Sequence, residues 1–428
     1  MDFSKRNGFK ETEIGMIPED WEVKKISEIT NLINVRGRTN VLPYIEIGDI
    51  DINSKNYKYK NKVSVNGCKK AFKDNLIISK VRPTRGAISL IKEDEIEVSS
   101  AFTVLSAKEN ADIEYIFLTL AYNDNFFSYL GKLQKGSNYP SCRDRDILDY
   151  SIPLPPLSEQ KKIAAVLSAV QEAKEKTEAV IKATKELKKS LMKHLFTYGP
   201  ISPKEAGNVA LKETEIGMIP EDWEVKRLGE SIESIDYGYS ISIPANKNDE
   251  GIPIISTADI TENGRILYNK VRKINPPKKI TEKLLLKNGD VLFNWRNSPE
   301  LVGKTAIFEL KEYKNYIYAS FILRIRCDEI RTHNVFLKYL LSYYRQIGVF
   351  FKLSRRAVNQ SNYNKNEIYV LLIPLPPLPI QQKIAEILSA VDEKIEAEEN
   401  KKKSLEDLFK TLLNNLMTGK IRVNNLEV

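Results

Sequence analysis

Histidine and cysteine are scarce in this chain of 428 residues. Its two histidines are His194 and His333, and its three cysteines, Cys68, Cys142 and Cys327, stand far apart with no CxxC pair. A histidine-based catalytic triad and a histidine zinc cluster are therefore nearly excluded, and neither a cysteine zinc site nor a disulfide framework is supported. We accordingly expect no metal site in this chain.

Long apolar stretches are also missing. No run approaches the roughly 18 apolar residues of a membrane span, and the opening MDFSKRNGFKETEIG lacks the apolar core of a signal peptide. Together with the isolated cysteines, these absences predict a globular protein of the reducing cytoplasm with no membrane partner.

Three short strings resemble enzyme motifs, and each is incomplete. Residues 298–305, SPELVGKT, have serine at the first glycine position of a phosphate-binding loop, and the AIFEL that follows favours a strand where a helix must start. NPPK at 275–278 has Lys278 where an adenine methyltransferase has the aromatic residue that stacks on the flipped base. The EVK of residues 22–24 resembles part of a nuclease motif, but its recurrence at 224–226 favours a structural role. The sequence predicts no catalytic residues.

The chain contains two long internal repeats. Residues 10–24, KETEIGMIPEDWEVK, return unchanged at 212–226, and IPLPPLSEQKKIAAVLSAV at 152–170 returns as IPLPPLPIQQKIAEILSAV at 373–391. Between these strips the sequence differs almost completely, and the second insert is 19 residues longer. Repeats this long indicate two copies of one fold rather than a solenoid, whose repeats run to about 20–50 residues. We expect function to reside where the copies differ.

Each copy begins with the repeated strip through Trp21 or Trp223, which favours a turn into a strand, and continues into a variable cassette, 26–151 or 228–372. Short β-like runs precede one helical stretch in each cassette, so both cassettes are expected to be mixed α/β. These runs and stretches are Pro43–Ile50, Leu76–Val81 and 113–130 in the first cassette, and Ile252–Ser256, Asp290–Trp295 and 334–351 in the second.

Each copy ends in the proline strip IPLPPL, which favours an extended hinge. A long Ala/Lys/Glu/Leu-rich helix follows, without Pro or Gly until Gly199 in the first copy and, after Pro379, until Gly419 in the second. The predicted organisation is thus four segments. They are a globular domain at 1–151, a hinge and spacer helix at 152–200, a second globular domain at 201–372, and a second hinge and helix at 373–428.

Both long helices carry an apolar seam at coiled-coil spacing, with polar interruptions near mid-length. The seam residues are Leu167, Val170, Ile181, Leu191 and Leu195 in the first helix, and Leu388, Val391, Ile395, Leu405, Phe409, Leu412 and Leu416 in the second. The simplest way to bury both seams is against each other, and a pseudo-twofold repeat would make the pair antiparallel. The alternative is that each helix packs on its own cassette.

The charge balance favours a nucleic-acid partner. Lys and Arg exceed Asp and Glu by 66 to 57, which gives a net charge of +9 and a pI near 9.0.

The chain strongly resembles the specificity (S) subunit of type I restriction-modification enzymes. The resemblance is carried by the opening GMIPEDWEVKKISEI, by the cassette phrases YIEIGDI, NLIISKVRPTRGAISLI, PIISTADI and GDVLFNWRNSPELVGKTAIF, and by both cassette ends, QKGSNYPSCRDRDILDYSIPLPPLSEQKKIAAVLSAV and SRRAVNQSNYNKNEIYVLLIPLPPLPIQQKIAEILSAV. It covers essentially the whole chain.

The resemblance implies a fold and a set of partners. Each cassette would be a target recognition domain that reads one half of an asymmetric bipartite site in double-stranded DNA. The two conserved helices would form an antiparallel coiled coil that separates these domains and docks methyltransferase (M) subunits, two by family analogy, which restriction (R) subunits then join. S-adenosylmethionine, ATP and Mg would bind the partner subunits, and this chain would bind no cofactor of its own.

Two loops in each cassette offer the side chains that DNA recognition needs. Arg, Asn and Gln can pair with base edges, while Lys and Arg on phosphates supply affinity. The candidates are Lys80, Arg82, Arg85, Lys135, Ser137, Asn138, Tyr139, Arg143 and Arg145 in the first cassette, and Asn294, Arg296, Asn297, Lys304, Arg355, Arg356, Asn359, Gln360 and Asn362 in the second. Taken singly, each side chain also fits an ordinary solvated surface, and aromatic residues such as Tyr139 fit core packing equally well.

A second function class remains open from the sequence. The chain could be a stand-alone two-domain DNA-binding or scaffold protein, and DNA binding by the isolated chain would favour this alternative. Dependence on a methyltransferase subunit would favour the specificity subunit.

Overall fold

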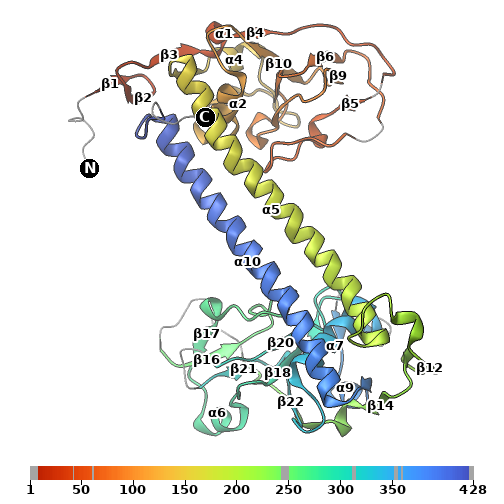
Figure 1. Cartoon of the computed structure of the whole chain (residues 1–428). Coiled ribbons are helices and arrows are strands. Elements are labelled where there is room, and N and C mark those ends of the chain that lie inside the picture. The colour runs from red at the N-terminus through yellow and green to blue at the C-terminus, as the bar shows by residue number, and fades with distance from the viewer. Residues whose placement is uncertain are drawn as a thin grey trace. The chain divides into compact units, whose positions relative to one another are not determined.

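A computed structural model of the chain describes residues 8–41, 43–59, 62–241, 250–310, 315–350, 355–357 and 360–423, of which 355–357, 360 and 361 are described by their backbone alone. The chain forms two compact units. Unit 1 comprises Met1–Glu178 and Asn400–Val428, and unit 2 comprises Ala179–Glu399. The two longest helices, α5 (Leu157–Tyr198) and α10 (Leu378–Met417), each begin in one unit and end in the other (Figure 1).

Unit 1 is built around a four-stranded antiparallel sheet with the strand order β4-β10-β7-β8. Its strands are β4 (Thr30–Leu32), β10 (Phe102–Ala107), β7 (Leu76–Ser79) and β8 (Ile88–Leu90). Strand β7 is buried at all four positions because both faces of the sheet are covered. Leu76 and Ile78 belong to a core shared with helices, whereas Ile77 belongs to a core shared with a second sheet.

The covering layers of unit 1 are helical on one face and β on the other. The helices are α1 (Ile26–Ile29), α2 (Ile113–Ala121), α3 (Asp124–Leu133) and α4 (Asp144–Leu148), and the second sheet joins β5 (Tyr44–Ile45), β9 (Glu95–Val98) and β6 (Lys69–Phe72). The stretch expected to be one helix at 113–130 is two helices. Asn123 interrupts it because its side chain accepts hydrogen bonds from the backbone N–H groups of Asn125 and Phe126, which caps the start of α3.

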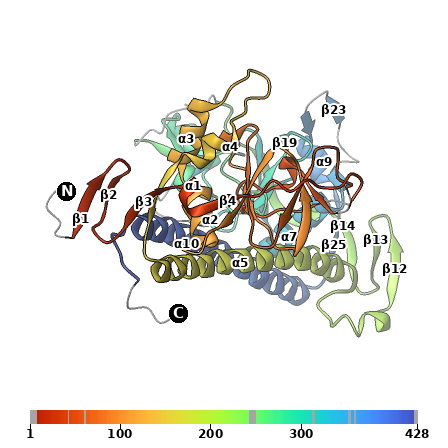
Figure 2. The same ribbon diagram turned by 90° about the horizontal axis from the view of Figure 1, so that it is seen from above.

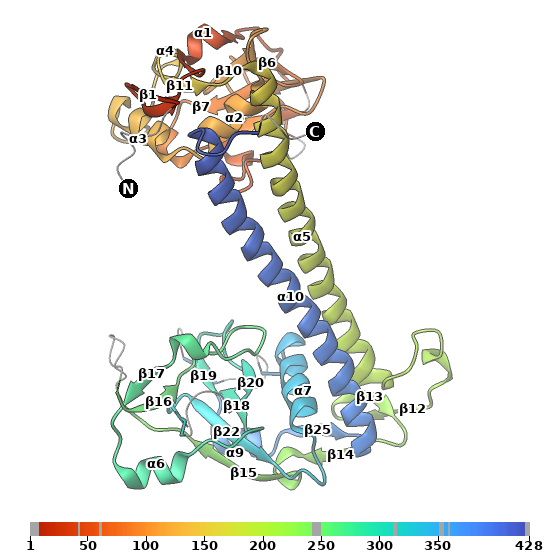
Figure 3. The same cartoon turned by 60° about the vertical axis from the view of Figure 1, so that its left-hand side comes forward.

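Unit 2 repeats this plan with different residues. Its four-stranded sheet has the order β15-β22-β18-β20, and its second sheet the order β17-β16-β21. The elements are β15 (Ile232–Tyr237), β22 (Ile322–Cys327), β18 (Val291–Asn294), β20 (Thr305–Ile307), β17 (Arg272–Ile274), β16 (Ile252–Ile255), β21 (Ile317–Tyr318), α6 (Lys278–Leu284), α7 (Asn334–Gln346) and α9 (Lys365–Tyr369). Figure 3 shows α7 between the four-stranded sheet and α10. Val291 and Phe293 face this helical side, and Leu292 faces the second sheet.

The repeated strips pair with each other inside each unit. Strands β3 (Glu22–Lys25) and β11 (Ser151–Leu154) form a two-stranded antiparallel sheet in unit 1, and β14 (Glu224–Arg227) and β25 (Leu372–Leu375) form its counterpart in unit 2. The proline strip is therefore extended, as predicted, but it is a paired strand rather than a free hinge. A two-stranded sheet accepts proline because both strands are edges.

The opening strip of each unit also forms a β-hairpin, which stands clear of the sheets of its unit in Figure 2. The hairpins are β1 (Phe9–Thr12) with β2 (Gly15–Pro18), and β12 (Leu211–Thr214) with β13 (Gly217–Pro220). Gly15 and Gly217 adopt φ of +108° and +105°, a region that favours glycine, which explains why both turns keep this residue.

A buried glutamine connects the start of each long helix to its cassette. Gln160 donates to the carbonyls of Pro155 at 2.8 Å and Asn110 at 3.3 Å, and accepts from the backbone N–H of Asp112 at 2.9 Å. Gln381 makes the same three bonds in unit 2, with Pro376, Arg331 and His333. Both side chains are fully buried, so the glutamine of the repeated strip fixes where α5 and α10 begin relative to α2 and α7.

Helices α5 and α10 pack antiparallel in both units, as predicted. In unit 1, Lys402 pairs with Glu178 at 2.7 Å. In unit 2, Lys185 pairs with Glu399 at 2.7 Å and Lys188 with Asp392 at 2.5 Å, so residue numbers fall along one helix as they rise along the other.

The ends of both helices also pack into the cassettes. Leu167 and Leu416 lie in the main core of unit 1, and Leu195 and Leu388 in that of unit 2. The other seam positions are buried at Ile181, Ile395 and Phe409 and half-buried at Val170, Leu191, Val391, Leu405 and Leu412. Thus each helix packs both on its partner helix and on cassette residues. Within the described residues, no helix is both long and apolar enough to cross a membrane.

Candidate nucleic-acid interface

The structure joins the two candidate loops of unit 1. Loop A (80–86) follows β7, and loop B (134–145) follows α3. Arg82 N donates to the carbonyl of Pro140 at 2.7 Å, and Cys142 N donates to the carbonyl of Lys80 at 3.0 Å. Val81 and Ser141 form the β-bridge between these bonds. Two segments about 60 residues apart in the sequence therefore share one surface.

Loop A has a tightly fixed backbone. Arg82 adopts a left-handed conformation (φ +49°) that non-glycine residues seldom adopt, and a single 3₁₀ turn, η3 (Pro83–Arg85), follows and ends at Gly86 (φ +71°). The Arg82 guanidinium lies 5.1 Å from the ring centre of Tyr139, which is 73% exposed. This contact places a cation and an open aromatic face side by side, a combination suited to a base or a phosphate.

Loop B presents a short polar tip. Lys135 and Ser141 exchange two backbone hydrogen bonds of 2.9 Å, which close the segment between them. The tip residues Ser137, Asn138 and Tyr139 are exposed as a result. Arg85, Lys135, Arg143 and Arg145 are exposed as well, whereas Lys80 and Arg82 are half-buried.

Two of the basic side chains form ion pairs within the unit. Lys80 pairs with Asp144 at 3.2 Å, and Arg145 with Asp149 at 3.2 Å. Burial by itself would raise the pKa of Asp144, but the hydrogen bond from Thr103 and the charge of Lys80 outweigh it and keep that pKa below its usual value. Asp144 thus stays ionised and holds Lys80 at the base of loop A.

The combined surface of loops A and B is basic. Residues 79–92 and 131–143 contain no aspartate or glutamate. Such stretches attract the phosphates of DNA, although Asp144 and Asp149 offset the charges of Lys80 and Arg145.

Unit 2 joins its two loops in the same way. Loop A (295–304) contributes β19 (Arg296–Asn297), and loop B (355–364) contributes β23 (Arg355–Ala357) and β24 (Gln360–Asn362). The three strands form one sheet in which Asn362 lies opposite both Arg296 and Arg355. Tyr363 N donates to the carbonyl of Trp295 at 3.0 Å, as Cys142 N does to Lys80 in unit 1.

The pairing gives matching positions in the two cassettes. Val81 corresponds to Arg296, because each follows the residue whose carbonyl accepts from loop B. Ser141 corresponds to Asn362, because Ser141 pairs with Val81 on one side and Asn362 pairs with Arg296. On the other side Ser141 pairs with Lys135, and Asn362 with Arg355. Each cassette therefore has a basic residue at this outer position, although the loop sequences differ.

Trp295 and Arg296 lie within an aromatic group in unit 2. The ring of Trp295 packs edge-on against Tyr237 and Phe321, and its Nε1–H donates to the carbonyl of Ser320 at 2.6 Å. The Arg296 guanidinium lies 5.0 Å from the ring centre of Phe321, which is 44% exposed. Trp295 thus supports the strand, and Arg296 sits beside an open ring as Arg82 does.

Two candidates of unit 2 are buried. Asn294 is fully buried and donates to the carbonyl of Leu301 at 3.2 Å. Lys304 is 6% exposed, and its ammonium donates to the carbonyls of Thr257 at 2.7 Å and Ile260 at 2.5 Å. Both side chains serve the structure of loop A, and we do not carry them into the proposed contact set. Asn297 is half-buried, and Asn359 lies outside the described residues.

Sequence reasoning missed Lys55, which lies in neither loop. It is 7% exposed, and its ammonium donates to the carbonyl of Gly86 at the end of loop A, at 2.9 Å. No signal in the sequence indicates this role, since Lys55 stands in a lysine-rich segment typical of an exposed surface.

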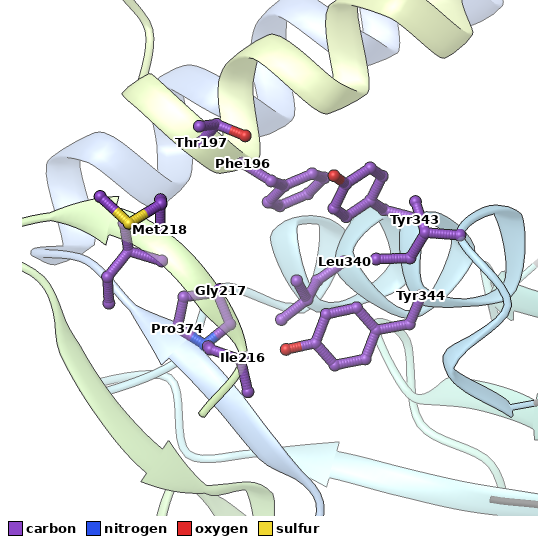
Figure 4. Close-up of a pocket in the computed structure, with 11 residues that line it drawn as sticks. Phe196, Thr197, Ile216, Gly217, Met218, Leu340, Tyr343, Tyr344 and Pro374 are labelled. Carbon is purple, nitrogen blue, oxygen red and sulfur yellow. The ribbon is translucent and has the colours of Figure 1, made fainter. Parts of the chain in front are cut away.

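Unit 2 also has a pocket of about 180 Å³ between α7, the end of α5 and the hairpin β12–β13 (Figure 4). Its walls are apolar and aromatic, with Phe196, Met218 and Leu340 among them, and no charged side chain lines it. The Tyr344 hydroxyl donates to the carbonyl of Leu372 at 2.9 Å. This lining suits neither phosphate nor acid-base chemistry. Across the described residues, no three His, Cys, Asp or Glu side chains form a group that could hold a metal ion.

Comparisons with known proteins agree with the doubled architecture. The family model of the type I restriction modification DNA specificity domain matches twice, at residues 18–185 and 220–407. A Methanocaldococcus jannaschii protein provisionally named type I restriction enzyme MjaX specificity subunit is 31% identical over 443 residues, which cover 99% of both chains. The type I restriction enzyme MjaVIII specificity subunit of the same organism is 30% identical over 446 residues, which cover 100% of this chain and 99% of that one.

A solved structure has the same fold. The S subunit of the type I restriction-modification system from M. genitalium matches 96% of this chain and 97% of its own, with a TM-score of 0.64 and 14% identity. The double match to the specificity domain covers most of the sequence. The chain therefore belongs to the DNA specificity subunits of type I restriction-modification systems, a non-catalytic family.

Proposed function

We propose that each unit reads one half of an asymmetric bipartite DNA site through the surface formed by its loops A and B. The observation that carries this proposal is the shared pairing of the two loops. Val81, Ser141 and Lys135 in unit 1 hold the same positions as Arg296, Asn362 and Arg355 in unit 2. A common backbone with different side chains is what two readers of different sequences require.

The proposed contacts divide by exposure and chemistry. The exposed Arg85, Lys135 and Arg143 can approach phosphates, which supply affinity without sequence information, and Arg145 can do so while paired with Asp149. Arg82, whose backbone is fixed and whose guanidinium lies on Tyr139, is positioned well enough to read a base edge. In unit 2, Arg296 and Asn362 hold the corresponding part of the surface.

The partners follow from the family. We propose that α5 and α10 dock two methyltransferase subunits, which bind S-adenosylmethionine and methylate adenine, and that restriction subunits with ATP and Mg complete the enzyme. We place this complex in the cytoplasm, where the three unpaired cysteines would stay reduced. The proposed domain boundaries are those given above, with target recognition domains at 1–151 and 201–372.

Methylome sequencing of a host that carries this chain with its methyltransferase tests the proposal. We expect one motif with two different half-sites, methylated only when both proteins are present. A chain that carries the first cassette in both positions should change the motif to a symmetric one, because both halves are then read by the same loops. The one-cassette, one-half-site assignment is wrong if the motif of this chain stays asymmetric.

A gel-shift experiment tests the dependence on partners. DNA of the identified motif should be bound tightly by the chain together with its methyltransferase, and weakly by the chain alone. Tight, sequence-specific binding by the isolated chain would contradict the proposed role and would favour a stand-alone DNA-binding protein.

A further inference from the structure

We propose that Lys55 and Lys304 are positioning residues that fix loop A in each unit and thereby set the sequence discrimination of the half-site which that unit reads. This inference rests on the proposed function. Both units have a turn at the same place, close to loop A.

The turn follows the first strand of the smaller sheet. In unit 1, the N–H of Glu46 donates to the side chain of Asp49 at 2.9 Å, and in unit 2 the N–H of Ser256 donates to that of Asp259 at 2.8 Å. We call these segments, 46–50 and 256–260, the capped turns. Strands β5 and β16, which lead into them, each pair in parallel with a later strand, so the two turns occupy equivalent places.

An equivalent glycine stands at the end of loop A in unit 1 and one residue before its end in unit 2. Ser79 N donates to the carbonyl of Ala87 in unit 1, and Asn294 N donates to that of Lys304 in unit 2, both at 2.9 Å. Ala87 therefore corresponds to Lys304, and Gly86 (φ +71°) corresponds to Gly303 (φ +81°). The end of loop A is thus held to its own first strand in the same way in both cassettes.

A buried ammonium connects the capped turn to this glycine region in unit 1. Lys55 lies just beyond the turn, and its Nζ reaches the carbonyl of Gly86 at 2.9 Å. The rings of Phe127 and Tyr122 lie 5.5 Å and 5.9 Å from the ammonium and complete its surroundings. A methyl group on Gly86 would come within 3.2 Å of Nζ, which shows how closely the two parts meet.

Unit 2 makes the same connection from the opposite side. Lys304 belongs to loop A, and its Nζ reaches the carbonyls of Thr257 and Ile260 in the capped turn. The equivalent residue of unit 1, Ala87, has no side chain that could do so. In unit 1 the segment just after the capped turn supplies the lysine, and in unit 2 loop A supplies it.

Two different solutions to one connection indicate that the connection itself matters. Burial lowers the pKa of both lysines, because removing an ammonium from water is unfavourable. An apolar side chain could fill either place without that cost, so packing alone does not explain the charge. A charged hydrogen bond to a backbone carbonyl does fix a loop in one position. Readout of a base edge needs such a fixed position, because its hydrogen bonds tolerate only small displacements.

The test uses the complete chain with its methyltransferase and the variants Lys55→Met and Lys304→Met, which keep the apolar stem and remove the ammonium. Relative binding of the cognate site and of sites with one changed base gives the discrimination at each half-site. We expect Lys55→Met to reduce discrimination about tenfold, or about 1.4 kcal/mol, only at the half-site read by unit 1. Lys304→Met should do the same only at the other half-site.

Matched controls are Lys58→Met near Lys55 and Lys287→Met in unit 2, both at exposed lysines. They should leave discrimination unchanged at both half-sites. A thermal melt accompanies each variant. Where a methionine variant loses its cooperative transition, the Lys→Gln variant, which removes the positive charge and is one bond shorter, takes its place under the same criteria.

Unchanged discrimination, or an equal loss at both half-sites, would overturn the inference. Its failure is distinguishable from failure of the proposed function. If the unaltered complex shows no bipartite recognition, the proposed function is wrong. If it shows bipartite recognition and the lysine variants keep it, only the positioning role is wrong.

Discussion

Replacement of Gln160 by leucine should destabilise unit 1 specifically. The side chain is fully buried and bonds Pro155, Asn110 and Asp112. Leucine has a similar size, so little cavity forms, but one N–H and two carbonyls lose their partner. The unpaired N–H should cost about 2 kcal/mol and each unpaired carbonyl about 1 kcal/mol, while the added apolar burial should return about 1 kcal/mol. The unfolding free energy should therefore fall by about 3 kcal/mol.

Hydrogen exchange resolved along the sequence is the appropriate assay, because two units need not unfold together. Gln160→Leu should raise the rate of amide hydrogen exchange in α2 and at the start of α5. Gln381→Leu should do so in α7 and at the start of α10. In a melt, about 3 kcal/mol corresponds to about 6–12 °C for a unit of about 200 residues.

The exposed neighbour Lys161 supplies the control, and Lys161→Ala should change the unfolding free energy by less than about 0.5 kcal/mol. The prediction is wrong if Gln160→Leu lowers the unfolding free energy by less than about 0.5 kcal/mol, or if it raises amide exchange equally in α2 and α7. The repeated glutamine would then have no part in fixing the helix to its cassette.

Three further predictions concern unit 1. Arg422 bonds the carboxylate of Glu159, whose side chain is 3% exposed, so Arg422→Leu should cost about 3 kcal/mol in chemical denaturation, and a change below about 1 would contradict this. The hydrogen bonds from Arg422 lower the pKa of Asp20 in the folded protein, so ionised Asp20 stabilises the fold above pH 3.8, and this stabilisation is lost as the pH falls below that value. Arg422→Leu should therefore make the unfolding free energy less dependent on pH below pH 3.8. Arg85→Ala should lower the slope of log affinity against log salt by about 0.9, whereas the exposed Lys73→Ala, outside both loops, should not.

Local sequence signals located the long elements well. The first cassette ends at the proline strip. The segment without Pro or Gly that follows this strip forms α5, which ends at Tyr198, just before Gly199. The runs at 76–81 and 290–295 became β7 and β18, each slightly shorter than expected. These elements were predictable because their determinants, a run of β-branched and aliphatic residues or a proline and a glycine at the ends, are adjacent in sequence.

The candidate site was only partly predictable. The sequence indicated that loops A and B are polar and basic, but not that Ser141 lies beside Val81 or Asn362 beside Arg296, since these pairs join segments far apart in the chain. It also offered Lys304 as a DNA contact, and the structure buries it against Thr257 and Ile260. The sequence does not distinguish a lysine whose ammonium is exposed to water from one whose ammonium is buried against backbone carbonyls.

The sequence alone determined the doubled frame and indicated the family, and it predicted the antiparallel helix pair that the structure confirms. The frame and the helix pair follow from repeats and periodicity, and the family follows from the resemblance of motifs along the chain, all of which are written in the order of residues. Only the tertiary structure decided which side chains of the cassettes are exposed, how the two loops of each unit combine, and that Lys55 supports loop A. Those properties arise from contacts between distant segments, because burial and hydrogen bonding depend on what the folded chain brings together.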